Sequence, residues 1–327
     1  MLIQQSLGDI EYAGKKRKTR KEVFLDRMEG LVPWGAIVEI IEPIYPKTNP
    51  KGGRPPIGIE KMLRMLLVSH WFNLSDEGCE DAVTENQTIR RFVRVNLSHQ
   101  NAPDATTLLK FRHLLESNGI YEQIFETINR LLIANGLTVS KGSIVDAAII
   151  TASSSTKNAD NARDPEMHAA KKGNQWFFGM KAHIGVDEET GITHTLVTTG
   201  ANTHDITVAH QLIRGGDETI RGDAGYVGLH KRPEIERIGK IGMTFEISKR
   251  IGTVRNMVEG SPERIAEYVK ASARAKVERA FLFIKSTFGY RKTRYRGLSK
   301  NRSRLFVLLA STNLLIAAEQ GRFCYGT

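Results

Sequence analysis

The sequence is poor in cysteine and has no long apolar run. Its 327 residues contain two cysteines, Cys79 and Cys324, which are too few and too far apart for a disulfide framework or a C-x-x-C metal clip. No stretch reaches the roughly 18 apolar residues of a membrane span, and the start "MLIQQSLGDI" lacks the basic and apolar regions of a signal peptide. These absences predict a cytoplasmic protein, and "LFVLLASTNLLIAA" from Leu305 is expected to be a core helix.

Acids are also scarce relative to bases. The chain has 36 Asp and Glu against 47 Lys and Arg, which gives a formal charge of +11 and a pI near 9.6. This balance favours a polyanionic partner, and nucleic acid is the leading expectation. From Lys285 to Arg304 there are eight bases and no acid, interleaved with Phe288, Tyr290 and Tyr295. Such a segment is typical of a surface that follows phosphates.

The pattern divides the chain into three parts. Residues 1–21 end in "KKRKTRK" and are expected to form a flexible basic arm. Residues 22–140 carry apolar residues at helical spacing, as in "IGIEKMLRMLLVSHWF" and "IYEQIFETINRLLIA", and Ser75 and Asp104 are candidate N-caps. We predict a helical N-terminal domain that binds DNA. Residues 141–327 change to a mixed strand and helix pattern and form a second domain.

The second domain is predicted to contain a mixed sheet, so the fold class is α+β. "SIVDAAII", "FFGMKAHIGVD" and "THTLVTTGAN" are expected strands, with "DEETG" as the hairpin turn between the last two. "ITVAHQLIRGG" is an expected helix that leads to a fourth strand ending at Asp223. If this strand lies parallel beside the first, Asp146 and Asp223 come close together. Gly222 and Gly225 are expected to leave the backbone room to approach DNA.

A third acid lies on the helix "ARAKVERAFLFIK". Glu278 shares one face of it with Arg274, Phe281 and Lys285. Three acids at one sheet edge suit hard divalent ions such as Mg²⁺, and two ions support phosphodiester cleavage. The alternatives remain open: Glu278 in a salt-bridged surface face, and Asp223 as an ordinary residue of a strand-to-loop turn.

Several longer motifs carry a resemblance over nearly the whole chain. They are "GGRPPIGIEKMLRMLLVSHWFNLSDE", "PDATTLLKFRHLLE", "STKN", "RDPEMHAAKKGNQWFFGMKAHIGVD", "LVTTGANTHD", "GDAGY" and "KASARAKVERAF". With these motifs the sequence resembles the DDE-type transposases of bacterial insertion sequences, specifically the insertion sequence five family. The signature Y-x2-R-x3-E-x6-K is met at Arg274, Glu278 and Lys285, but its Tyr position is Ala271, and Tyr268 lies one turn earlier.

The resemblance implies a ribonuclease H-like catalytic domain in which Asp146, Asp223 and Glu278 are catalytic and bind two Mg²⁺ or Mn²⁺ ions. It implies binding of terminal inverted repeats, strand cleavage at the element ends, and joining of the 3′-hydroxyls to target DNA. Arg274 and Lys285 would contact phosphates. Double-stranded DNA and a homodimer are the implied partners, and a cytoplasmic protein associated with the bacterial nucleoid is the implied setting. Only 55 positions separate Asp223 from Glu278, which leaves no room for a large β insertion.

Other residues are candidate DNA contacts on composition. These are Lys171, Lys172, Trp176, Arg291, Lys292, Arg294 and Arg296. Trp176 has two interpretations, stacking on a displaced base or core packing, and core packing is favoured. The spacing of His183, His204 and Asp205 does not match a zinc site. Two rival functions stay open: a DNA-binding protein without chemistry, and a hydrolytic nuclease of the same fold.

Overall fold

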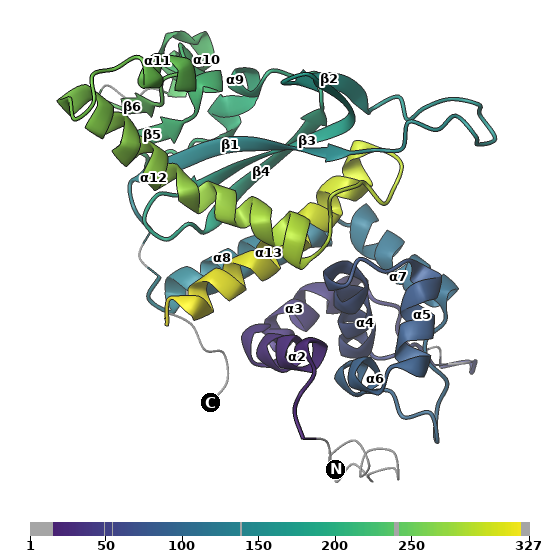
Figure 1. The fold of residues 1–327 in the computed structure, drawn as a ribbon. Coiled ribbons are helices and arrows are strands. Elements are labelled where there is room, and N and C mark those ends of the chain that lie inside the picture. The colour runs from purple at the N-terminus through teal and green to yellow at the C-terminus, as the bar shows by residue number, and fades with distance from the viewer. Residues whose placement is uncertain (1–15, 49, 54, 138, 239–241, 322–327) are drawn as a thin grey trace.

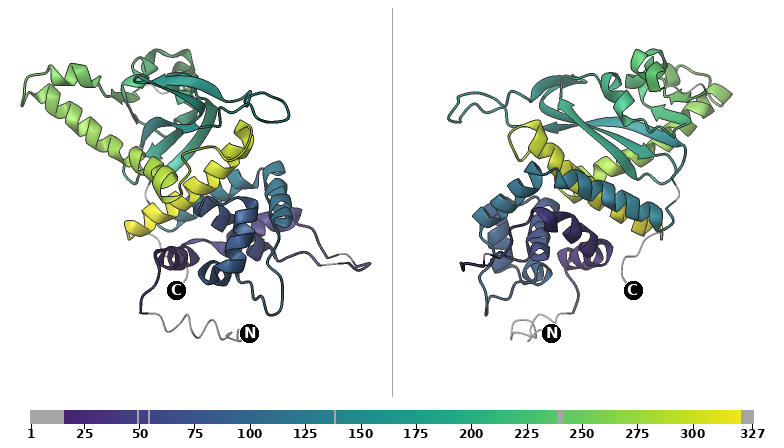
Figure 2. Two further views of the ribbon diagram at one scale, coloured as in Figure 1. Left: turned by 45° about the vertical axis from the view of Figure 1, so that its right-hand side comes forward. Right: turned by 180° about the vertical axis from the view of Figure 1, so that it is seen from behind.

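The computed structural model describes residues 16–48, 50–53, 55–137, 139–238 and 242–321. They form a mixed α/β protein with a helical part followed by a sheet part (Figure 1). Figure 2 shows from two more sides that α8 (Ile120–Ala134) and α13 (Leu298–Glu319) lie between the sheet and the other N-terminal helices.

The helical part confirms the predicted helical character of the front of the chain. Besides α8 its elements are α2 (Arg20–Leu31), α3 (Trp34–Ile41), η1 (Glu42–Ile44), α4 (Ile59–Trp71), α5 (Asp76–Glu85), α6 (Gln87–Val93) and α7 (Ala105–Ser117). Both predicted N-caps are confirmed. The Ser75 hydroxyl accepts from the Gly78 N–H at 2.9 Å, and the Asp104 carboxylate accepts from the Thr107 N–H at 2.6 Å.

The first described helix begins inside the segment predicted as a basic arm. Thr19 and Glu22 form a capping box at its N-terminus, so Arg20 and Lys21 are helical. Residues 1–15 of the arm lie outside the described residues.

Among the described residues, the sheet part contains six strands. They are β1 (Gly142–Thr151), β2 (His168–Lys172), β3 (Gln175–Asp187), β4 (Thr193–Gly200), β5 (Thr219–Gly222) and β6 (Thr244–Ile247). β3 pairs antiparallel with β1, β2 and β4, which confirms the predicted hairpin turn between β3 and β4. β2 was not expected, because five residues with an exposed Lys171 and Lys172 give no apolar alternation.

The fourth predicted strand does lie parallel beside the first. β5 pairs with β1 over only three residues, from Gly142 opposite Thr219 to Ile144 opposite Arg221, and β6 continues the sheet in parallel on the far side of β5. Beyond Ile144 the two strands pair no further. Asp146 and Asp223 each lie two residues past that last pair, so they stand where the strands diverge.

The remaining elements cover the two faces of the sheet. They are α9 (Asp205–Val208), η2 (Ala209–Leu212), η3 (Ala224–Tyr226), η4 (Leu229–Lys231), α10 (Pro233–Ile238), α11 (Ile251–Arg255), α12 (Pro262–Leu282), the π-helical turn η5 (Phe283–Thr287), and α13. The helix expected from Ile206 is a short α-turn followed by a 3₁₀ turn. The helix of Glu278 ends at Leu282, and the π turn carries Lys285.

One hydrophobic cluster joins the two parts of the chain. It includes residues of β1, β3, α4, α8, α12 and α13. The side chains of α13 from Leu305 to Ala317 are buried, which confirms the predicted core helix, and the Trp71 indole donates to the Ser311 hydroxyl at 2.9 Å. In the described ranges, no helix combines the length and apolar character that crossing a membrane requires.

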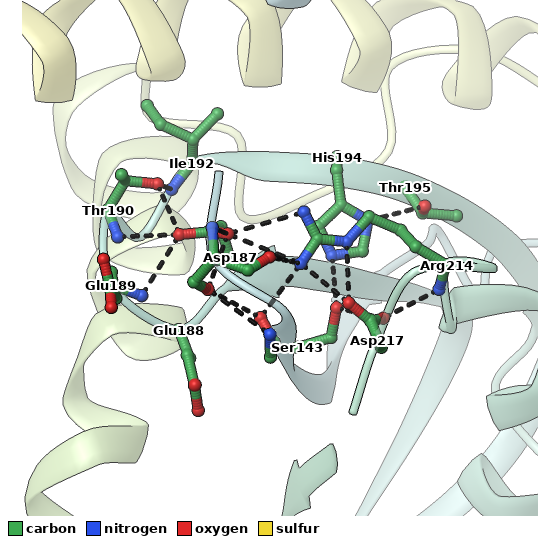
Figure 3. A network of polar contacts seen from close by, with 12 residues as sticks. Ser143, Asp187, Glu188, Glu189, Thr190, Ile192, His194, Thr195, Arg214 and Asp217 are labelled. Atoms are coloured by element: carbon green, nitrogen blue, oxygen red, sulfur yellow. Dashed lines mark hydrogen bonds and ion pairs between the residues drawn. The ribbon is translucent and has the colours of Figure 1, made fainter. Parts of the chain in front are cut away.

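A closed polar network ties the beginning of β1 to the neighbouring loops (Figure 3). Asp217 accepts from the Ser143 hydroxyl at 2.6 Å and from the Arg214 backbone at 2.8 Å, and the Arg214 guanidinium bridges Asp217 and Asp187. Asp187 also accepts from Ser140 and Thr190. Burial alone would raise the pKa of Asp187, but these hydrogen bonds prevail and lower it. The network therefore fixes the register of β1 with buried carboxylates that share one guanidinium and are hydrogen-bonded.

Candidate active site

The diverging ends of β1 and β5 open into a cavity of about 470 Å³, which we call the acid cavity. All three predicted acids line it, together with both predicted phosphate contacts of α12 and η5 and both lysines of β2. The lining comprises Asp146, Ala147, Ala148, Ile149, Ala170, Lys171, Lys172, Lys181, Asp205, Asp223, Arg274, Glu278, Phe281 and Lys285. The crevice beyond the carboxyl ends of parallel strands is a common ligand site in α/β sheets.

Asp146 is held in an environment that disfavours its charge. Burial raises its pKa to about 6; the backbone hydrogen bond from Ala147 and the charge of Arg274 oppose this rise, while the charges of Asp223 and Asp205 add to it. A carboxylate so placed gains free energy from a proton or from a bound cation.

Asp223 is oriented by the turn that follows β5. Its carboxylate caps η3 and accepts from the Gly225 N–H at 2.8 Å. A Cβ on Gly225 would lie 2.9 Å from that carboxylate oxygen, and a Cβ on Gly222 would meet the Tyr226 ring at 3.0 Å. In the structure, the absence of a Cβ at Gly222 and Gly225 makes room for the Tyr226 ring and the Asp223 carboxylate; their predicted role in the approach to DNA stays a prediction.

Glu278 reaches the acid cavity from α12, and its residue is exposed. Among the described residues it has no ion-pair partner, so the expected alternative of a salt-bridged surface face does not form. Arg274, one turn earlier, has a buried Nε without a hydrogen-bond acceptor in the described structure. Both side chains are thus available to a ligand in the cavity.

The donor set fits a hard cation only in part. Carboxylate oxygens are the ligands that Mg²⁺ and Mn²⁺ prefer, and Asp146 and Asp223 repel each other without a cation. Within the described ranges, however, no three Asp, Glu, His or Cys side chains stand close enough together to hold a metal ion. A metal site with all three predicted acids therefore requires at least one of their side chains to move.

Sequence reasoning missed two residues that line this cavity, Asp205 and Lys181, and a third that interacts with its acids, Tyr226. Asp205, at the start of α9, lies in the cavity and is paired with Lys181 at 2.9 Å. Tyr226 does not line the cavity, but it has a buried hydroxyl without a hydrogen-bond partner in the described structure, and its pKa is raised by burial and by the charges of Asp205, Asp146 and Asp223. The motifs "NTHD" and "GDAGY" contain Asp205 and Tyr226, but neither spacing indicates a shared cavity.

The predicted DNA contacts lie in different surroundings. Lys171, Lys172 and Lys285 line the acid cavity. Lys285 has a pKa lowered by burial and by the charges of Lys172 and Arg291. Trp176 is 67% exposed on β3, so the favoured interpretation as a core residue is wrong. Its strand-pairing partner across the β2–β3 hairpin is Lys171, one of the cations that line the acid cavity.

The basic segment after Lys285 is not one uniform surface. Arg291 and Lys292 are exposed, and Arg291 contacts the π turn through the Lys285 carbonyl. Arg294 donates to the Asn73 carbonyl of the helical part, and Arg296 pairs with Asp160. Arg304 is 1% exposed and cannot reach a ligand outside the protein.

Two further features noted in the sequence, the rejected zinc pattern and Tyr268, also have a defined place in the structure. His183 and Asp205 approach to 3.6 Å, but His183 is buried against Thr199, and the described residues contain no metal-holding group there. Tyr268, the nearest Tyr to the empty signature position at Ala271, is 57% exposed and is absent from the cavity lining.

Fold and cavity define a class: a basic α/β protein in which acids, lysines and an arginine line one cavity where two parallel strands diverge. This arrangement is suited to phosphate chemistry. The family model "Transposase DDE domain" matches residues 138–314, more than half of the chain, and "Transposase domain (DUF772)" matches residues 13–114. The chain therefore belongs to the Transposase DDE domain family.

A solved structure is also similar over much of the chain. It is described as the cryo-EM structure of piggyBac transposase synaptic complex with hairpin DNA. The similarity covers 94% of this chain and 79% of that chain, with 12% sequence identity and a TM-score of 0.45. A likeness of this degree assigns no role to any residue.

Proposed function

We propose that this transposase, of the insertion sequence five type, binds the terminal inverted repeats of its element, cleaves DNA strands and joins the 3′-hydroxyl ends to target DNA. The observation that carries the proposal is the shared cavity of Asp146, Asp223 and Glu278, with Arg274 and Lys285 in the same wall. A ribonuclease H-like assignment for residues 141–327 agrees with the parallel placement of β5 beside β1. The helical residues 22–140 and the basic arm 1–21 are assigned to DNA binding.

Each side chain has a defined task in this proposal. Asp146, Asp223 and Glu278 would hold Mg²⁺ or Mn²⁺ once at least one of these side chains has moved; two such ions supply charge that activates an attacking oxygen and stabilises a leaving oxygen. Arg274 and Lys285 bind the scissile phosphate and offset its charge. Lys171, Lys172, Arg291, Lys292, Arg294 and Arg296 bind flanking phosphates, and Trp176 stacks on an exposed base. Two ends are joined by a homodimer on DNA.

Labelled DNA that carries the sequences flanking the gene tests this proposal, with a supercoiled target plasmid and Mg²⁺ or Mn²⁺. We expect nicked and joined products from the wild type and none from Asp223→Asn, which should still bind the DNA. Glu263→Gln, an exposed acid on the same helix as Glu278, is the matched control and should retain activity.

The other outcomes identify the rivals. Binding without any cut in either metal ion would mean a DNA-binding protein without chemistry, and nicks without joined product would mean a hydrolytic nuclease. Cleavage by Asp223→Asn would overturn the assignment of that acid. A readout independent of activity is thermal unfolding: Mn²⁺ should raise the Tm of the wild type but not that of Asp223→Asn, because ligands stabilise the state that binds them.

A further inference from the structure

A second cavity of about 560 Å³ adjoins the acid cavity. The two share five lining residues, which are Ile149, Lys172, Glu278, Phe281 and Lys285. The second cavity adds Thr151, Phe177, Leu282, Ser286 and Arg291, so it extends away from the aspartates along the end of β1 and the π turn. No residue of this extension has an assigned role in the chemistry, apart from Arg291 as a predicted DNA contact.

The lining has two chemical halves. Phe177, Phe281 and Leu282 provide aromatic and aliphatic surface. Lys172, Lys285 and Arg291 provide positive charge, and in the described structure none of these three makes an ion pair with an acid. A cavity with an apolar wall and an unpaired basic rim is complementary to a flat apolar ring linked to a phosphate.

The rim is held in place. The Arg291 guanidinium donates to the Lys285 carbonyl at 2.9 Å and to the Ser286 hydroxyl at 3.3 Å, and the Arg291 carbonyl accepts from the Thr151 N–H at 3.2 Å. These bonds attach the segment after the π turn to the end of β1. The cation at the mouth of the cavity is therefore positioned by the fold before any ligand arrives.

We propose that this second cavity, the base cavity, takes one unpaired nucleobase of the DNA strand whose phosphate lies in the acid cavity. The inference rests on the proposed function. The base leaves its stack and packs against Phe177 and Phe281, while Lys172, Lys285 and Arg291 bind its phosphates. Unstacking costs a few kcal/mol, and stacking on aromatic side chains returns about 1–3 kcal/mol per base. The wall accepts any base, because aromatic and aliphatic contacts do not depend on hydrogen-bonding edges.

Binding of two single-stranded 12-mers in EDTA, measured by fluorescence anisotropy, tests the proposal. One is a thymidine 12-mer and the other is fully abasic, so they share phosphates and differ in bases. Wild type should bind the thymidine strand at least about tenfold more tightly. Phe177→Ala, and Leu282→Ala at an exposed position, should each lower the affinity for the thymidine strand about fivefold or more, and the affinity for the abasic strand less than twofold.

Three further variants make the result specific. Tyr268→Ala, an exposed aromatic on the same helix as Leu282 but outside both cavities, should change neither affinity. Lys172→Gln should lower the affinity for both strands by the same factor, because Lys172 binds phosphates. Trp176→Ala removes the exposed indole of the residue next to Phe177 and measures how much of the base-dependent affinity comes from it.

The proposal is overturned if the wild type binds both strands equally, or if all discrimination disappears in Trp176→Ala while Phe177→Ala and Leu282→Ala bind as wild type. A cooperative thermal transition must be retained by each variant, and Phe177→Leu, which keeps apolar volume without a ring, should recover part of the loss. If the base cavity does not bind a base but the proposed function is correct, the flanking-DNA assay still shows metal-dependent cleavage. If the proposed function is wrong, cleavage is absent, and the difference in affinity between the two strands is still measured separately.

Discussion

The two halves of β1 lie beside carboxylates in opposite electrostatic states. We call the part at Ser143 the closed end, and the part from Asp146 onward, which lines the acid cavity, the open end. Near Ser143, Asp187 and Asp217 are buried, and Arg214 and hydroxyl donors pair with them (Figure 3). Three residues beyond Ser143, Asp146 faces Asp223 and Asp205, and burial raises its pKa to about 6. One strand is therefore flanked by charges that stabilise the fold and also carries, in Asp146, a charge that the fold places at a cost.

The difference separates a structural site from a functional one. Buried ion pairs with every lone pair satisfied lock a register, and removing one partner leaves an uncompensated charge. Acids that repel each other in a cavity gain from a ligand instead, so perturbed pKa values mark candidate functional sites. His194 belongs to the closed end, where burial and the charge of Arg214 lower its pKa to about 3 and keep it neutral.

The largest expected loss of stability follows from breaking the polar network at the closed end of β1. Asp217→Asn should lower the free energy of unfolding by about 3–5 kcal/mol, because Arg214 loses a buried counter-charge. Urea unfolding monitored by circular dichroism measures this loss. Glu259→Gln, an exposed acid outside the network, is the control and should change stability by less than about 0.5 kcal/mol. A loss below 1 kcal/mol in Asp217→Asn would show that the network adds little.

An Asp→Asn substitution at the open end should change stability in the opposite direction. The pKa of Asp146 rises from 3.8 to about 6 on folding, so the unfolded state binds fewer protons than the native state between these values, and stability falls as pH rises through this window. Asp146→Asn removes that cost and should raise the free energy of unfolding by about 1–3 kcal/mol at pH 7.

The pH dependence checks the cause. The gain of Asp146→Asn over wild type should be fully present above pH 6, about half as large at pH 5, and nearly absent at pH 4. Urea unfolding of both proteins at these three values measures it. A gain that is constant with pH would assign the effect to packing, and a loss of stability at pH 7 would contradict the charge argument.

The smallest effect on stability is expected at Glu278. This residue is exposed and has no ion pair among the described side chains, so Glu278→Gln should change stability by less than about 0.5 kcal/mol. Cleavage of flanking DNA should nevertheless be lost if Glu278 completes the metal site. A folded Glu278→Gln protein with wild-type cleavage would remove this acid from the site and leave Asp205 as the third candidate.

Much of the local structure was predictable, and the exceptions have local causes. The caps at Ser75 and Asp104 and the long apolar periods of α4, α8 and α13 depend on residues within one or two turns. β2 was missed because it is short and polar. The expected helix from Ile206 proved to be two short turns, and Trp176 proved to be exposed because the hairpin of β2 and β3 carries it away from the core.

The sequence by itself determined the excess of bases, the order of helices and strands, and the identity of three candidate acids, because composition and short-range periodicity are properties of neighbouring residues. Only the tertiary structure decided which charges are paired and which are left facing one another. Asp205 and Asp223 reach Asp146 through strand pairing and a crossover, whereas Asp217 is paired with Arg214 and Ser143. Asp217 is buried as well, so the partners that the fold brings to each acid separate their electrostatic states.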